Sequence, residues 1–147
     1  MNDFLHKLPA FVGNHMALSA LFVILLLALI ASQFMVLLRK YKELTPAGLT
    51  LLINRETPLL VDISPRDSFE KGHIPGARHV PMSQFDPENK DLAKAKELPV
   101  VVICRSGQTA HGAAQRLVKA GFEKVFILGG GMGAWNQAQL PVAKGNK

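Results

Sequence analysis

The chain contains one cysteine, Cys104, at a position where a side chain could carry out chemistry. It follows residues 100–103, a run of valine and isoleucine typical of a strand buried on both faces of a parallel sheet. Open α/β sheets bind ligands at the carboxyl ends of their strands, so this position favours a reactive thiol. The alternative is a small apolar residue that ends a buried strand. A lone cysteine excludes an internal disulfide and a cysteine-based metal cluster.

The loop after the cysteine is predicted to bind an anion through Arg105, Ser106, Gly107, Gln108 and Thr109. The backbone N–H groups of such a loop converge on a common centre, and the positive end of the following helix dipole reinforces them. The same field favours the thiolate form of the cysteine, which is the nucleophilic form. Arg105 either adds a cation that steers anions or is an ordinary solvated arginine.

Strand and helix patterns alternate around this loop, which predicts an α/β fold with an open, mainly parallel sheet flanked by helices. Strands are predicted at 59–63, 78–80, 100–104 and 125–128. Helices are predicted at 46–54, at 66–71, after the loop as far as residue 120, and in a last segment that includes 132–138. The charged stretch 86–97 is interpreted as a solvated helix or loop.

The run from Ala17 to Leu38 carries no charge and, as a helix rising about 1.5 Å per residue, is long enough to cross a bilayer. A cleaved signal peptide is the alternative, but its apolar region is only about 7–15 residues long. We expect a transmembrane helix over 17–38, a short extracytoplasmic tail over 1–16, a basic linker over 39–43 and a soluble domain over 44–147. Arg39, Lys40 and Lys42 place that domain in the cytoplasm by the positive-inside rule.

Composition sets wider limits. The chain has 147 residues, of which 48% are hydrophobic and 19% charged, so a disordered or fibrous protein is excluded. The formal net charge of +6 comes from scattered basic residues, and we expect no nucleic-acid partner. The sequence shows no metal-ligand pattern.

The soluble segment resembles the rhodanese family over its whole length. The matching motifs are Leu60-Val61-Asp62, Gly72-His73-Ile74-Pro75-Gly76-Ala77, Cys104-Arg105-Ser106-Gly107, and Gly129-Gly130 with Trp135 and Leu140-Pro141-Val142. The residues before the apolar run, Phe11-Val12-Gly13, His15 and Leu18-Ser19, are similar to those of bacterial membrane-anchored members. This resemblance implies a rhodanese fold behind one transmembrane helix, in the bacterial inner membrane.

The resemblance also implies a sulfurtransferase that needs no cofactor. The Cys104 thiolate would attack the outer sulfur of a donor such as thiosulfate, sulfite would leave, and the persulfide would pass its sulfur to a thiol or to cyanide. The implied partners are a small anionic sulfur donor, a thiol acceptor, the bilayer and a membrane protein. Asp62 is similar to the family's acidic residue at the end of the first strand, which implies a supporting role through hydrogen bonds; the alternative is an ordinary loop-capping aspartate.

Two positions depart from the family pattern. Thr109 stands where many members have arginine, so the chain keeps a hydroxyl but lacks a charge. Ser64 also stands where arginine is common, and Arg66 lies two residues further on, so a salt bridge made by the family arginine would be lost or rerouted.

Three other side chains have structural interpretations. His73 is predicted to be a hydrogen-bonded loop residue rather than a general base, His111 to be exposed, and Trp135 to anchor the last helix in the core.

Two other functions were weighed. A cysteine-dependent phosphatase needs arginine six residues after the cysteine, and that residue is Ala110. The stronger alternative is a membrane-tethered interaction module with the same fold and little or no catalysis, since a fold does not determine a function.

Overall fold

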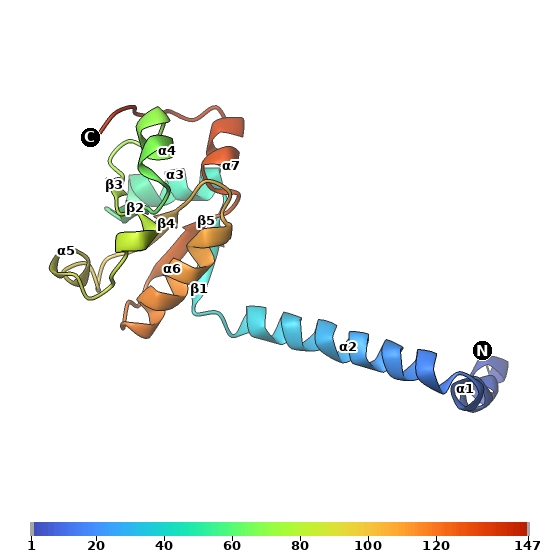
Figure 1. Cartoon of the computed structure of the whole chain (residues 1–147). Helices are drawn as coiled ribbons and strands as arrows, with labels where there is room; N and C mark the ends of the chain where they lie inside the picture. The colour runs from blue at the N-terminus through green and yellow to red at the C-terminus, as the bar shows by residue number, and fades with distance from the viewer. Residues whose placement is uncertain (1, 147) are drawn as a thin grey trace. The chain divides into compact units, whose positions relative to one another are not determined.

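The computed structural model describes residues 2–146, with the side chains of all of these except Asn2, Phe4, Val36 and Leu37. The chain folds as two compact units, a first that ends at Arg39 and a second that begins at Lys40 (Figure 1).

The first unit is helical. It consists of α1 (Asn2–Asn14) and α2 (Met16–Leu37). Consecutive apolar residues of α2, such as Phe22 (66% exposed), Val23 (51%) and Ile24 (62%), are all exposed, so no face of this helix is covered by protein. Over Met16–Met35 it is long and apolar enough to cross a membrane, the one such helix among the described residues. A helix that is apolar on every side requires an apolar environment.

The second unit is built on a five-stranded parallel sheet in the order β1-β5-β4-β2-β3. Its strands are β1 (Tyr41–Leu44), β2 (Leu59–Asp62), β3 (Arg78–His79), β4 (Val100–Ile103) and β5 (Val125–Leu128). The central strand β4 is buried along its whole length, as its unbroken β-branched sequence predicts. Asp62 pairs in register with Ile103, so β2 and β4 end side by side.

Helices cover both faces of the sheet (Figure 1). On one face, α5 (Lys90–Ala93) and α6 (Gln108–Lys119) pack on a cluster that includes Val100, Val102 and Cys104. On the other, α3 (Pro46–Arg55), α4 (Arg66–Lys71) and α7 (Gly131–Gln137) pack on a cluster that includes Val101 and Ile103. A short 3₁₀ helix, η1 (Met82–Gln84), follows β3. The predicted α/β fold is confirmed.

The edge strand β1 differs from the prediction. Residues 41–43 belong to a strand, so the basic linker predicted over 39–43 is wrong in this part, and the sheet begins before residue 44. The pattern is that of an edge strand, because Tyr41 is buried while Lys42 and Glu43 are exposed. The Tyr41 hydroxyl is hydrogen-bonded to Nδ1 of His111 on α6 at 3.0 Å. His111 is therefore half-buried, and its predicted exposure is wrong.

Other differences are confined to the ends of elements. β4 ends at Ile103, so Cys104 is the first residue after the strand, and β2 ends at Asp62. The helix after the cysteine begins at Gln108, earlier than the end of the predicted loop. Trp135 is buried as predicted, and its indole N–H donates to the carbonyl oxygen of Pro141 at 2.9 Å.

Candidate active site

The cysteine lies between the end of β4 and the start of α6. Its side chain is buried, with 4% of its surface exposed. The backbone N–H of Gly107 donates a hydrogen bond to the Cys104 Sγ at 2.9 Å. Gly107 is also the residue that caps α6, with a φ of 87° that side chains other than glycine rarely adopt. The sulfur therefore meets a backbone donor at the positive end of a helix, which stabilises a thiolate.

The start of α7 holds this loop from behind. The N–H of Met132 donates to the carbonyl oxygen of Cys104 at 2.9 Å, and the N–H of Gly133 donates to that of Arg105 at 3.2 Å. This close approach depends on Gly131, because a Cβ there would overlap the Cys104 carbonyl oxygen. A Cβ at Gly107 would lie 3.0 Å from the N of Gly130. The two glycine segments thus fit against each other backbone to backbone.

A pocket of about 390 Å³ opens beside the sulfur. It is lined by Ile63, Ser64, Pro65, Pro81, Met82, Ser83, Cys104, Arg105, Ser106 and Thr109. Arg105 is the charged residue of this lining. A larger pocket of about 700 Å³ shares Ser64, Arg105 and Ser106 with it and adds a second cation, Lys71.

The predicted loop residues separate into two groups. Arg105, Ser106 and Thr109 line the cysteine pocket together with Cys104, whereas Gln108 does not. Gly107 acts through its backbone and is buried. Gln108 and Thr109 lie in the first turn of α6 rather than in a loop.

Asp62 lies at the end of β2, fully buried, and acts on Ser64 rather than on the cysteine. Its Oδ1 accepts hydrogen bonds from the Ser64 N–H at 2.9 Å and from the Ser64 hydroxyl. Its Oδ2 has no hydrogen-bond partner among the described residues. Nε2 of His79 donates to the Ser64 carbonyl oxygen at 2.8 Å, so both main-chain polar groups of this pocket residue are held.

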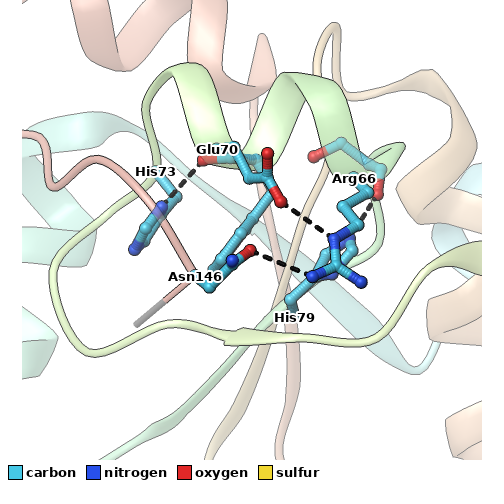
Figure 2. A network of polar contacts seen from close by, with 7 residues as sticks. Arg66, Glu70, His73, His79 and Asn146 are labelled. Carbon is cyan, nitrogen blue, oxygen red and sulfur yellow. Dashed lines mark hydrogen bonds and ion pairs between the residues drawn. The ribbon is translucent and has the colours of Figure 1, made fainter.

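A polar network extends outward from Ser64 (Figure 2). Nδ1 of the buried His73 donates to the Phe69 carbonyl oxygen at 2.8 Å, which agrees with the predicted hydrogen-bonded loop histidine. The Phe69 ring stacks on His73 and on His79. Arg66 pairs with Glu70 at 2.8 Å and donates to the Asn146 Oδ1 at 3.3 Å. Arg66 therefore points into a separate surface network, and the position taken by arginine in many rhodaneses is filled here by the Ser64 hydroxyl.

Sequence reasoning missed part of the site. Met82 and Ser83 of η1 line the pocket, and the N–H groups of Met132 and Gly133 fix the loop, although none of the four was singled out for these contacts. The triple glycine at 129–131 was a signal for the second pair, whereas nothing local marks the first. Within residues 2–146, no group of three or more His, Cys, Asp or Glu side chains could hold a metal ion.

This arrangement defines a class of site: a buried nucleophilic sulfur at the end of a parallel strand, with backbone and guanidinium donors for an anion beside it. Residues 45–138 match the rhodanese-like domain family. The chain belongs to the rhodanese-like family.

Two relatives and one solved structure extend this assignment. The uncharacterized protein YibN of Escherichia coli (strain K12) is 37% identical over 142 residues, which cover 96% of this chain and 99% of YibN. The thiosulfate sulfurtransferase GlpE of Pseudoalteromonas translucida (strain TAC 125) is 32% identical over 98 residues, 67% of this chain and 91% of GlpE. A crystal structure of thiosulfate sulfurtransferase from Pseudomonas aeruginosa matches with a TM-score of 0.64 and 27% identity, over 72% of this chain and 20% of that one.

Proposed function

We propose that this protein is a membrane-anchored sulfurtransferase that carries sulfane sulfur as a persulfide on Cys104. The observation that carries the proposal is the hydrogen bond from the Gly107 N–H to the Cys104 Sγ, at the start of α6 and beside a pocket with a cation. A purely structural cysteine needs neither the donor nor the pocket. The sulfurtransferase relatives support the same activity.

The first half-reaction forms the persulfide. The Cys104 thiolate attacks the outer sulfur of thiosulfate, an S–S bond forms, and the original sulfur–sulfur bond breaks with its electron pair leaving on sulfite. The Gly107 N–H and the positive end of α6 stabilise negative charge at the cysteine sulfur. Arg105, Ser106 and Thr109 line the space in which the donor's sulfonate would lie, with Arg105 as its cation.

The second half-reaction restores the enzyme. A thiolate or cyanide attacks the outer sulfur of the persulfide, and the bond to the Cys104 sulfur breaks with its electron pair returning to the cysteine thiolate. The products are a persulfide of the acceptor or thiocyanate, and no external oxidant or reductant is needed. The larger pocket, which shares Ser64, Arg105 and Ser106, offers room for an acceptor larger than cyanide.

The proposed location follows from α2 and its flanks. We propose that α2 anchors the chain in the bacterial inner membrane, with the N-terminus outside and the catalytic unit in the cytoplasm. Arg39, Lys40 and Lys42 follow the helix, whereas Lys7 is the only lysine or arginine that precedes it. The cytoplasm is reducing, which keeps a thiol available for sulfur transfer. Anchoring would also bring the catalytic unit near a membrane-protein partner.

Intact-mass spectrometry of the full chain in detergent micelles tests the activity. After thiosulfate treatment we expect a mass gain of one sulfur atom that cyanide removes, and no gain in a Cys104→Ser control. A soluble version should begin at Lys40, because a start at Leu44 removes most of β1. If Cys104 stays unmodified by both thiosulfate and polysulfide, the activity is wrong and the tethered interaction module takes its place, with crosslinking in membranes as the next step.

Labelling of intact cells tests the topology. In the Cys104→Ser background, a cysteine at His6 (His6→Cys) should react with a membrane-impermeant maleimide added outside spheroplasts. A cysteine at the exposed Lys96 (Lys96→Cys) should react only after the membrane is broken. The reverse pattern would overturn the proposed orientation, and loss of residues 1–35 from the mature chain would identify a signal peptide.

A further inference from the structure

The N-terminal helix α1 separates its apolar and polar residues. Leu5, Leu8 and Val12 follow a spacing of three and four residues, which brings them to one side of a helix. Phe11 follows Leu8 by three residues and extends that side. Asp3, Lys7 and Asn14 follow spacings of four and seven and lie on the opposite side.

No protein covers the apolar side among the described residues. Leu5 is 62% exposed, Phe11 56% and Val12 46%, whereas apolar side chains of the sheet are buried almost completely. The helix also lacks the all-round apolar character of α2, because charged and amide side chains occupy its other side. Such a helix does not cross a bilayer, but it matches the boundary between headgroups and acyl chains.

The junction with α2 limits where α1 can lie. A single residue, His15, separates the two helices, and it is held by hydrogen bonds on both sides: its N–H donates to Phe11 O at 3.0 Å, and its carbonyl accepts from Ser19 N at 2.9 Å. When α2 spans a bilayer, the end of α1 must therefore lie at the membrane surface. Figure 1 shows α2 along its length and α1 down its axis, so the chain turns between them.

From this amphipathic side and this junction, we propose that α1 lies in the outer headgroup region of the bilayer, with Leu5, Leu8, Phe11 and Val12 in contact with acyl chains. The partner is the lipid surface, not a protein. This inference rests on the proposed membrane anchor, and it replaces an unstructured tail with a second membrane contact that fixes the depth and rotation of α2.

Fluorescence quenching in full-length protein tests the placement. Single cysteines are introduced into the Cys104→Ser chain as two matched pairs, Leu8→Cys with Lys7→Cys and Val12→Cys with Asn14→Cys, and each is labelled with an environment-sensitive fluorophore. The protein is reconstituted into vesicles of phosphatidylethanolamine and phosphatidylglycerol. We expect nitroxide near the lipid headgroups to quench the labels at Leu8 and Val12 at least about threefold more than their partners. Aqueous iodide should show the opposite preference.

A label at Ile24 (Ile24→Cys), in the middle of α2, separates failure of this inference from failure of the anchor. Deep nitroxide should quench it. If it does so while all four α1 labels are equally open to iodide, α1 does not lie in the interface. If the labels at Leu8 and Val12 are shielded from both quenchers, a second copy or another protein covers the apolar side and the lipid proposal is wrong. If the Ile24 label is open to iodide, both the anchor and this inference are overturned.

Discussion

Two neighbouring strands end side by side at the carboxyl edge of the sheet, and the segments after them are held in different ways. After β4, the main chain at Cys104 and Arg105 is held by N–H groups of Met132 and Gly133. After β2, the side chains of Asp62 and His79 hold Ser64. Both segments contribute to the pocket beside the cysteine sulfur.

The difference predicts opposite sensitivities to mutation. A segment held by the backbone of its neighbour depends on side chains being absent, so the cysteine loop should be damaged by added atoms. A segment held by side chains depends on their presence, so Ser64 should be displaced by removed atoms. Additions at glycines are the harsher change, because a packed backbone cannot yield without shifting a whole element.

The largest effect is expected for Gly131→Ala. The added methyl group would overlap the Cys104 carbonyl oxygen, and alanine is strained at the φ of 58° found there. We expect a loss of about 3 kcal/mol in the free energy of unfolding, together with loss of persulfide formation. Chemical denaturation of the Lys40–Lys147 segment and intact-mass spectrometry would measure the two changes.

Gly133→Ala is the matched control. It adds the same methyl group two residues further along α7, where the nearest atom outside that helix is the Arg105 carbonyl oxygen at an ordinary 3.7 Å. Alanine is also the better helix former by about 1 kcal/mol, so the variant should be as stable as the parent or more so. Equal damage by both alanines would show that α7, rather than its contact with the cysteine loop, is what fails.

The backbone-held segment was also the more predictable of the two. The β-branched run at 100–103 predicts a buried strand, the cysteine follows it, and Arg105, Ser106 and Thr109 reach the same pocket because they are close in sequence. Ser64, Met82 and Ser83 reach that pocket from other strands and turns. No local pattern reports such a meeting, because it depends on how β2, β3 and β4 are ordered in the sheet.

One missed strand accounts for a missed contact elsewhere. Tyr41–Leu44 is short, and two of its four residues are exposed charges, so it could not be distinguished from a basic linker after an apolar helix. Without β1 the sheet lacks the strand that carries Tyr41, and His111 on α6 has no partner there. Its predicted exposure followed from that omission rather than from its position in the helix.

Asp62→Ala tests the side-chain-held segment by removal. The change takes away the acceptor of the Ser64 N–H and hydroxyl, both buried, and we expect a loss of about 2 kcal/mol in the free energy of unfolding. The KM for thiosulfate should rise, because Ser64 lines the pocket. Denaturation and steady-state kinetics would measure these changes. Ser64→Ala, which keeps the main-chain hydrogen bond, should cost about half as much; an equal cost would assign the effect to the hydroxyl alone.

Thr109→Arg adds atoms to the cysteine segment where there is room for them. Thr109 is exposed and lines the pocket, in which Arg105 is the charged residue. A second cation should lower the KM for thiosulfate by about 3- to 10-fold, and the effect should shrink as salt is added. Steady-state assays at two ionic strengths would show this. Thr109→Gln adds length without charge, so a similar fall in KM in that variant would contradict the electrostatic explanation.

The smallest effect is expected for Arg66→Ala, at the outer end of the side-chain network in Figure 2. The Arg66 side chain is 70% exposed, and exposed ion pairs such as that with Glu70 contribute little, so the free energy of unfolding should change by less than about 0.5 kcal/mol. The KM for thiosulfate should not change, because Arg66 does not line the cysteine pocket. Kinetics of Arg66→Ala beside Glu70→Ala would decide the point. A several-fold rise in KM in the first variant alone would mean that Arg66 leaves Glu70 to bind the donor, and so supplies the charge that Ser64 lacks.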